Sequence, residues 1–301
     1  MSGGNSVCLT FDFDGMCSWI TSWQSNNPSM ISRGEFDTIG LERVLGLLRK
    51  HNIRATFFVP GHTIWAWPDL VRRVADEGHE IGHHGWAHEN PATLDLAGER
   101  DIMERGFEAI EWAVGQRPAG YRSAAWDFSP NTIDLLLEYD FVYSSSCMAN
   151  DFYPYYLRKG DRWSMTDPYV FGQLTDLVEL PPSWHLDDFP PFEFVWRGNT
   201  GHMPPSAVKE IWQREFDYMV ANCPGGVYVL TCHPQFIGRG YRIQMLDELA
   251  EHMRNTPGVR FETALEVARR FKDEHPRDRW AAANPHRTGA TARNAKAAAN
   301  A

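Results

Sequence analysis

The sequence has few cysteines, and none of them form the spaced pairs that bind structural metals or carry redox chemistry. The five cysteines are an odd number in 301 residues and include no CxxC pair. This scatter argues against a disulfide framework and against a zinc knuckle, and it predicts reduced thiols of the kind found in cytoplasmic proteins. The five are Cys8, Cys17, Cys147, Cys223 and Cys232.

Basic residues and long apolar runs are also scarce. The chain has 29 Lys and Arg against 39 Asp and Glu, a net charge of −10, which argues against a nucleic-acid partner because a phosphate backbone requires a basic face. No apolar run is long enough to cross a bilayer, and the opening Met-Ser-Gly-Gly-Asn lacks the basic and apolar parts of a signal peptide. We therefore expect a cytoplasmic protein with neither a membrane nor a nucleic acid as partner.

Short apolar runs alternate with segments of helical periodicity along most of the chain. This alternation predicts an α/β fold of parallel strands joined by crossover helices and closed into a distorted (β/α) barrel, a single domain over residues 1–275. An open doubly wound sheet is the alternative, but no glycine-rich phosphate loop follows the first strand. The Ala/Arg/Asn-rich tail, 276–301, has no apolar periodicity and is predicted to be disordered. The eight predicted strands are 7–11, 55–59, 79–83, 120–122, 141–145, 177–180, 227–231 and 259–262.

Four histidines fall within ten residues, 79–88, where a predicted strand runs into a Gly- and Pro-punctuated loop. His84 and His88 are four residues apart, so one turn of helix or a tight loop directs both imidazoles to a common point. Imidazole is the commonest protein ligand for zinc and related metals, and such sites often add a carboxylate. The alternative is a set of hydrogen-bonded core or surface histidines, so the cluster needs a carboxylate partner.

Polar residues that do not suit a core follow the predicted strands at their carboxyl ends, the rim where barrel enzymes build active sites. Asp12 and Asp14 end the first strand, and if the strand continues through them they project together, about 6.6 Å apart along the backbone. One carboxylate then binds a metal while the other reaches a metal-bound water. A solvated strand end is the alternative. The remaining rim residues are His84, His88, Arg122, Trp184, Asp187, Asp188 and His233.

An Asp-His-His set leaves metal positions open for water and substrate, as in a catalytic site. The metal lowers the pKa of its water and polarises a carbonyl under attack, and a nearby carboxylate accepts the proton. His233 is placed to protonate the departing nitrogen, with Asp187 or Asp188 tuning it. Arg122 would hold Asp12 in a charge-assisted pair and keep it ionised. The alternatives are a turn-capping histidine, a surface ion pair and a solvated acidic loop.

These residues resemble the motifs of the polysaccharide deacetylases, the NodB-like enzymes of carbohydrate esterase family 4. Residues 10–15, Thr-Phe-Asp-Phe-Asp-Gly, resemble the first motif, usually written Thr-Phe-Asp-Asp-Gly. Residues 82–88 are similar to the His-Ser/Thr-x-x-His metal motif, and residues 120–124 lie where the Arg-containing third motif belongs. Residues 230–234, Leu-Thr-Cys-His-Pro, are similar to the last motif. The order and spacing extend over roughly residues 6–270.

Within that family the chain resembles a mostly non-secreted branch, which contains peptidoglycan-deacetylase-like and allantoinase-like proteins. The resemblance implies that Asp14, His84 and His88 bind a divalent metal, usually zinc. It also implies that the backbone N–H near Ser123 stabilises the oxyanion.

The resemblance assigns the acid–base roles as well: Asp12 is the base, Arg122 its orienting partner and His233 the acid. Two positions depart from the family pattern. Phe13 separates the two acids, and Ala124 replaces the Pro expected after the Arg. These departures are the support for a third hypothesis, a metal-binding module without catalysis.

Two enzymatic hypotheses share this site. The first is hydrolysis of an N-acetyl amide on an amino sugar of the polysaccharide or peptidoglycan type. The second is ring opening of a small cyclic amide such as allantoin, with the loops at 16–36, 150–170 and 184–200 as a lid; the same aromatic loops also suit a homo-oligomer interface. Aromatic residues that are candidates to stack on sugar rings are Trp65, Trp67, Trp86, Trp126, Tyr155, Trp163 and Trp184.

Overall fold

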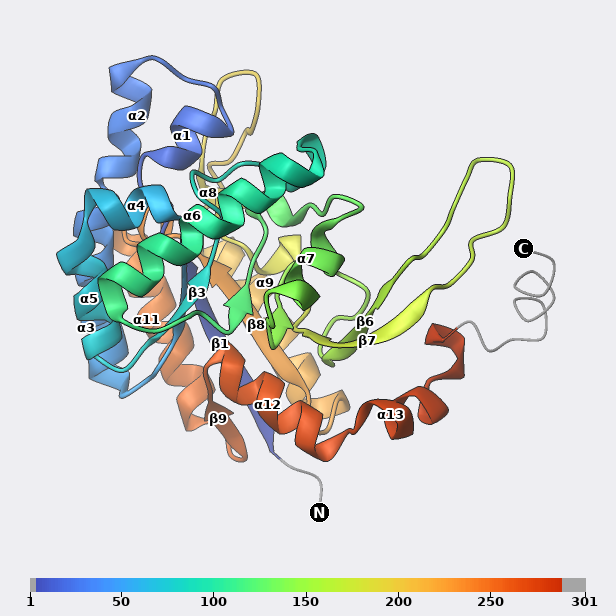
Figure 1. Ribbon diagram of the computed structural model, residues 1–301. Coiled ribbons are helices and arrows are strands. Elements are labelled where there is room, and N and C mark those ends of the chain that lie inside the picture. The colour runs from blue at the N-terminus through green and yellow to red at the C-terminus, as the bar shows by residue number, and fades with distance from the viewer. Residues whose placement is uncertain (1–3, 289–301) are drawn as a thin grey trace.

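The strands form one curled, mostly parallel sheet in a computed structural model that describes residues 4–288 (Figure 1). Their order is β6-β7-β5-β4-β3-β2-β1-β8, and β9 pairs with β1 beside this path. Helices pack around the sheet, and the predicted distorted (β/α) barrel is confirmed. The strands are β1 (Asn5–Asp12), β2 (Thr56–Val59), β3 (Glu80–His83), β4 (Gly120–Tyr121), β5 (Tyr143–Ser144), β6 (Tyr155–Lys159), β7 (Gln173–Glu179), β8 (Val227–Cys232) and β9 (Val259–Phe261).

Most of the longer helices are crossovers between parallel strands, as in other α/β folds. Helix α6 shows how local sequence sets their ends. The side chain of Asp95 accepts a hydrogen bond from Gly98 N–H at the start, and Gly115 ends the helix in the left-handed conformation, with φ of 69°. The helices are α1 (Cys17–Thr21), α2 (Pro28–Glu35), α3 (Asp37–His51), α4 (Gly61–Ala66), α5 (Pro68–Asp76), α6 (Leu96–Val114), α7 (Thr132–Glu138), α8 (Phe189–Phe192), α9 (Pro205–Asn222), α10 (Pro234–Ile237), α11 (Gly240–Asn255), α12 (Ala264–Glu274) and α13 (Arg277–Ala283), with 3-10 turns η1 (Pro91–Thr93), η2 (Ala124–Trp126), η3 (Trp184–Leu186) and η4 (Pro285–Arg287).

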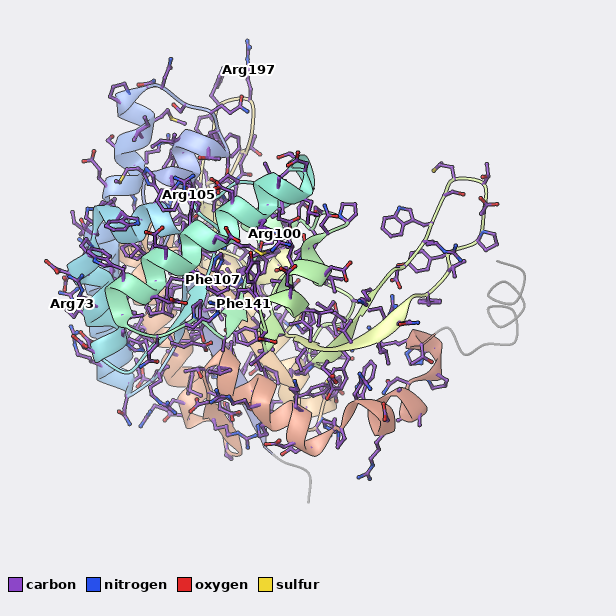
Figure 2. The ribbon with its side chains drawn as sticks, in the orientation of Figure 1. Arg73, Arg100, Arg105, Phe107, Phe141 and Arg197 are labelled. Atoms are coloured by element: carbon purple, nitrogen blue, oxygen red, sulfur yellow. The ribbon has the colours of Figure 1, made fainter. Side chains whose placement is uncertain are left out.

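Strand β1 is buried along its whole length and divides the core into two apolar clusters. Val7, Leu9 and Phe11 pack in one cluster with the residues of α3, whereas Cys8, which lies between Val7 and Leu9, packs in the other. The second cluster also contains Phe107 of α6 and Phe141, both labelled in Figure 2. Their ring centroids lie 5.2 Å apart. Fully burying a side chain of this size stabilises the fold by about 1.5–3 kcal/mol. The alternation fixes which β1 side chains face each layer.

The barrel has a seam where its two sheet ends meet. Strand β8 pairs with β1 on one side, and on the other a parallel bridge joins Thr231 of β8 to Asp187, in the segment after β7. At the amino end of β8, Val227 N–H donates to the carbonyl of Phe152 at 2.7 Å. The seam therefore brings the acidic segment that follows β7 to the carboxyl end of β8.

Two segments differ from the prediction. Strand β6 was not among the predicted strands; it pairs antiparallel with β7 in a hairpin that projects from the body in Figure 1. Residues 277–283 of the tail, predicted to be disordered, form α13, because Trp280 is buried with its ring 5.6 Å from that of Tyr156. Residues 289–301 of that tail lie outside the described residues. Along 4–288, no helix combines the length and the apolar character needed to cross a membrane.

Candidate active site

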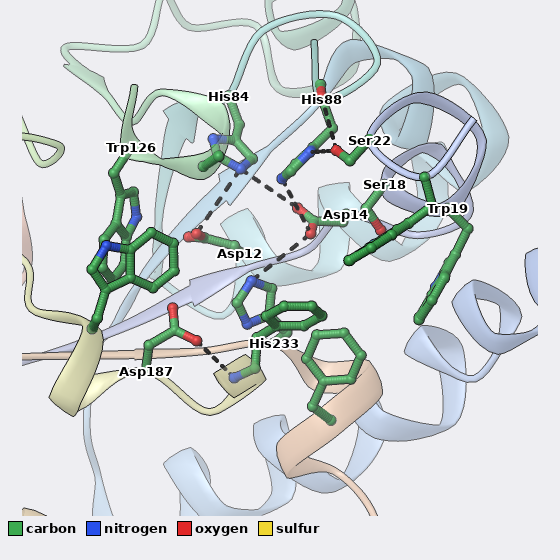
Figure 3. A pocket seen from close by; sticks show the side chains of 15 residues that line it. Asp12, Asp14, Ser18, Trp19, Ser22, His84, His88, Trp126, Asp187 and His233 are labelled. Atoms are coloured by element: carbon green, nitrogen blue, oxygen red, sulfur yellow. Dashed lines mark hydrogen bonds and ion pairs between the residues drawn. The ribbon is translucent and has the colours of Figure 1, made fainter. Parts of the chain in front are cut away.

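A cavity of about 150 Å³ lies at the carboxyl ends of the barrel strands. Figure 3 shows the polar side chains that point into it from three parts of the rim. Asp12 ends β1 and Asp14 lies in the loop that follows, His84 and His88 lie in the loop after β3, and His233 follows β8. Segments far apart in the sequence therefore meet because the strands are parallel and end at the same rim.

Asp14 faces both histidines of the loop after β3. Its Oδ1 lies 3.5 Å from Nε2 of His84, and its Oδ2 lies 3.6 Å from Nε2 of His88. Among the described residues, Asp14 Oδ1 and His84 Nε2 are buried atoms without a hydrogen-bond partner. Unpartnered buried lone pairs that point at one another are costly unless a cation lies between them. The three residues therefore fit a divalent metal ion.

Both imidazoles have the protonation state that a metal requires. Burial lowers the pKa of His84, and it lowers the pKa of His88 to about 4, so the rings are neutral at physiological pH. The Nδ1 of His84 donates to the carbonyl of Arg122 at 2.7 Å, which fixes the tautomer with a bare Nε2. The Nδ1 of His88 lies 2.6 Å from the hydroxyl of Ser22. Ser22 was not among the predicted site residues, although its loop, 16–36, was predicted to form part of a lid.

Asp12 lies beside this set and is held by a buried arginine. Arg122 Nη1 donates to Asp12 Oδ1 at 2.7 Å and to the hydroxyl of Thr10 at 3.0 Å. The other oxygen, Oδ2, is 3.9 Å from His84 Nε2. Burial alone would raise the pKa of Asp12, but the charge and hydrogen bond of Arg122, together with the charge of His233, bring it below its ordinary value. Asp12 is therefore a carboxylate with one oxygen held and the other toward the cavity.

The insertion of Phe13 between the two acids does not separate them in space. The strand ends at Asp12, but Phe13 N–H still donates to the carbonyl of Phe58 at 2.9 Å, so the alternation continues for one more residue. The Phe13 side chain is buried on the opposite side, with its ring 5.8 Å from that of Trp67. Asp12 and Asp14 consequently face the same cavity, as the alternation predicts.

His233 lies across the cavity, with Nε2 3.9 Å from Asp14 Oδ2. Its Nδ1 lies 2.6 Å from Asp188 Oδ1. Burial lowers the pKa of His233, but Asp188 and Asp187 outweigh burial and raise it well above its ordinary value. Asp187 lines the cavity, and burial raises its pKa to about 7. The seam thus supplies a protonated imidazole that faces Asp14.

The predicted substrate residues divide into those that reach the cavity and those that do not. Trp126 and Trp184 line it, with ring centroids 4.2 Å apart. Ser123, predicted to provide an oxyanion donor, is not among the lining residues, and its N–H donates to the hydroxyl of Ser146 at 3.0 Å. That N–H is therefore engaged within the fold, and the prediction for Ser123 is not supported by the geometry.

Most of the other rim aromatics predicted to bind sugars lie elsewhere. Trp65 stacks on Trp112 at the surface, with centroids 4.2 Å apart, and Trp163 is exposed on the β6–β7 hairpin. His79 and His83 also stay out of the cavity; the Nε2 of His83 donates to the carbonyl of Met103.

The cavity has an apolar wall whose residues the prediction did not name, although two of its segments, 16–36 and 184–200, were predicted to form a lid. The wall comes from the loop after β1 and from the seam, and its aromatic residues are Trp19, Trp23, Phe189 and Phe236. Trp19 is fixed by a hydrogen bond of 2.7 Å from Nε1 to Oε1 of Gln235. The aromatic content of residues 16–36 was the available signal, but the side of the barrel on which they fold is not a local property.

The chain is similar to known proteins in sequence and in fold. Residues 2–144 match the sequence profile of the family described as polysaccharide deacetylase. A peptidoglycan deacetylase of Helicobacter pylori is 36% identical over 285 residues, which cover 90% of this chain and 97% of that protein. The crystal structure of a Mycobacterium smegmatis protein assigned as a polysaccharide deacetylase has a TM-score of 0.80 and 33% identity, covering 91% of this chain and 92% of the other. An allantoinase, Puue, has a TM-score of 0.75 over 90% of this chain and 91% of its own, but at 21% identity this likeness concerns the fold alone.

Proposed function

The chain belongs to the polysaccharide deacetylase family, and from this premise we propose that it is a divalent-metal-dependent hydrolase of amide bonds. Its substrate in this proposal is an N-acetylated amino sugar of the peptidoglycan type. The observation that carries the proposal is the pair of unpartnered buried atoms, Asp14 Oδ1 and His84 Nε2, which face each other at 3.5 Å beside His88.

We assign Asp14, His84 and His88 as the metal ligands and zinc as the metal. Bound there, the cation would supply a water of lowered pKa and polarise the carbonyl of the amide. Asp12 accepts the proton of the attacking water at Oδ2, since Arg122 already holds Oδ1 at 2.7 Å. Arg122 keeps Asp12 ionised and oriented, which makes it a base at neutral pH.

His233 donates the second proton. In its protonated form it presents Nε2–H to the cavity while Asp188 holds Nδ1 at 2.6 Å. As the carbon–nitrogen bond breaks, His233 protonates the departing nitrogen, so the products are acetate and a free amine. Asp12 and His233 thus take part in two separate proton transfers, one from the attacking water and one to the departing nitrogen, as general acid–base hydrolysis requires.

Trp126 and Trp184 provide the surface for the sugar ring in this proposal. They line the mouth of the cavity side by side, and the flat apolar faces of sugar rings pack on aromatic rings. The cavity itself, at about 150 Å³, is of a size that holds one small group. An acetamido group would occupy it while the ring stays outside against the tryptophans.

A cyclic-amide hydrolase is the second candidate. The same small volume and the apolar wall from Trp19 and Phe236 suit a compact ring that enters the cavity whole. The catalytic residues keep their roles, but no acetate is released. A cytoplasmic location, a homo-oligomeric state and a single domain over 1–275 remain predictions from the sequence.

One assay separates the candidates. Metal-loaded and chelated protein are compared on N-acetylglucosamine oligomers and on a panel of cyclic amides. Acetate release that is lost on chelation supports the deacetylase, whereas acid production without acetate from a cyclic amide supports the second candidate. Activity that survives complete removal of the metal would contradict both, and a metal-bound protein inactive on every substrate would favour the module without catalysis.

A further inference from the structure

One peptide group connects a proposed metal ligand to a buried turn. The carbonyl of Arg122 accepts the Nδ1 hydrogen of His84 at 2.7 Å, and the N–H of Ser123, on the other side of the same peptide bond, donates to the Ser146 hydroxyl at 3.0 Å. A peptide bond is planar and rigid, so its C=O and N–H move together. The orientation of the His84 ring is therefore coupled to the position of Ser146.

The same turn also holds the arginine that orients the proposed base. Arg122 Nε donates to the carbonyl of Ser145 at 3.1 Å, and Nη2 donates to the Ser145 hydroxyl at 2.8 Å. The third nitrogen, Nη1, donates to Asp12. Arg122 is fully buried, and these bonds leave its guanidinium one orientation. Ser145 therefore supports the orientation of Asp12 through Arg122, and Ser146 supports the orientation of His84 through the 122–123 peptide group.

The side chain of Glu179 helps to fasten this turn to the sheet, beside the bond from Ser145 N–H to the carbonyl of Tyr121 in β4. Glu179, the last residue of β7, accepts hydrogen bonds at Oε1 from Ser146 N–H at 2.6 Å and from Cys147 N–H at 3.0 Å. Strand β5 is only two residues long, and its Ser144 pairs with Glu179 in the ladder. Beyond Ser144 the strand pairing ends, and the Glu179 side chain provides the hydrogen-bond acceptor for the backbone N–H groups that follow. Buried N–H groups of this kind need such a partner.

We propose that Glu179 and the turn it holds, residues 145–147, form the positioning element of the active site, with Ser146 orienting the ligand His84 and Ser145 orienting Arg122 against Asp12. None of these residues touches substrate or metal. The proposal rests on the proposed function, since it assigns supports to the ligand and the base named there. It goes beyond the site itself, because it predicts that Ser146 affects mainly metal affinity whereas Ser145 affects mainly turnover.

The serine pair provides the test. Co²⁺ titration followed by absorbance gives metal affinity, and kinetics on an N-acetylglucosamine oligomer give kcat and KM. Ser146→Ala is expected to weaken Co²⁺ binding about 10- to 100-fold, the effect typical of a lost ligand support. Ser145→Ala is expected to leave the affinity within about 3-fold and lower kcat about 10-fold at unchanged KM, a loss of about 1.4 kcal/mol of transition-state stabilisation. Ser129→Ala, at a buried serine that bonds Glu99, is the matched control.

Glu179 supplies the second arm. Glu179→Ala should lower both Co²⁺ affinity and kcat, and Glu179→Gln should restore both because an amide oxygen still accepts the two N–H groups. If Ser146→Ala binds Co²⁺ as tightly as Ser129→Ala, or if the two serine variants change affinity and kcat in the same proportion, the proposal is overturned. Wild-type protein that binds no Co²⁺ overturns the proposed function itself and this inference with it, and the wild-type titration distinguishes that failure. Should Glu179→Ala not fold, the serine variants still decide.

Discussion

Asp188 holds His233 by two different bonds, one to the ring Nδ1 at 2.6 Å and one to the backbone N–H at 3.0 Å. A carboxylate that bonds both the backbone N–H and the ring of one histidine fixes the rotamer of that side chain as well as favouring its charged form. The free Nε2 is then left facing Asp14 across the cavity. This relationship leads to the first prediction.

Asp188→Asn should move the alkaline limb of the pH–rate profile to lower pH. Burial lowers the pKa of His233, and Asp188 is the main group that raises it against burial. With a neutral amide the pKa falls, so the protonated acid is lost at a lower pH. The profile of kcat against pH measures this, with Co²⁺ affinity as the control that should not change. An alkaline limb at the wild-type position would remove His233 from the acid role.

His88→Ala should abolish metal binding and activity, whereas His79→Ala should retain both. The His88 ring faces Asp14 at 3.6 Å. His79 lies at the other end of β3, where Nδ1 accepts the N–H of Ala55, so its loss affects only local packing. Elemental analysis after dialysis measures the metal content of each variant. Equal metal in the two proteins would contradict the ligand assignment.

His233→Ala should keep the metal and lose turnover by about 10²- to 10⁴-fold, the usual contribution of a positioned acid. The ring contacts Asp14 only at 3.9 Å, which is too long for a hydrogen bond. Metal content and kcat are measured on the same preparation. Loss of metal in this variant would mean that His233 binds the cation instead.

Glu179→Gln should change how the free energy of unfolding depends on pH. Burial raises the pKa of Glu179 from 4.5 to about 8 in the folded protein, so the folded state binds that proton more tightly than the unfolded chain. The resulting stability is complete below about pH 4.5 and is lost as the pH rises through about 8. Urea unfolding of both metal-free proteins between about pH 5 and pH 9 should show the wild type losing on the order of 2–4 kcal/mol relative to the variant. Parallel curves would show that Glu179 is ionised when folded.

Trp184→Ala should raise KM for an N-acetylglucosamine oligomer about 2- to 10-fold with little effect on kcat. Trp184 is partly exposed beside Trp126 at the cavity, and an aromatic contact contributes about 0.5–1.5 kcal/mol. Trp65→Ala is the control, because Trp65 is equally exposed but stacks on Trp112 away from the cavity. If both variants keep the wild-type KM, the tryptophans do not form the sugar-binding surface.

Sequence patterns determine much of the fold because the parallel strands are buried on both faces and appear as continuous apolar runs. Strand β1 is the clearest example, and its alternation places Asp12 and Asp14 on one side. Strand β6 escaped prediction because it ends in Arg158 and Lys159, and only its pairing with β7 makes it a strand. Trp280, likewise, orders α13 through a contact with a residue more than a hundred positions away.

The rim residues could be predicted because parallel strands carry their following residues to one edge. The loops 16–36 and 184–200 were predicted as a lid, but the individual residues that they bring to the cavity could not be predicted. Ser22 and Trp19 reach the cavity only because the loop after β1 folds over it, held by a bond from Trp19 to Gln235. Glu179 is an ordinary strand residue in the sequence, and its part in the site depends on its register opposite Ser144. Register and loop direction are tertiary properties that local composition does not encode.

The proposed catalytic acid and the carboxylate that holds it lie on opposite sides of the barrel seam. Asp187 bridges Thr231 across it. Asp188 directly follows Asp187, and His233 lies two residues after Thr231. Any slight parting of the two sheet ends would lengthen the bond between acid and carboxylate before it disturbed Asp14, His84 or Arg122. Heat or mild denaturant should therefore abolish turnover while the metal ion is still bound, before the protein unfolds.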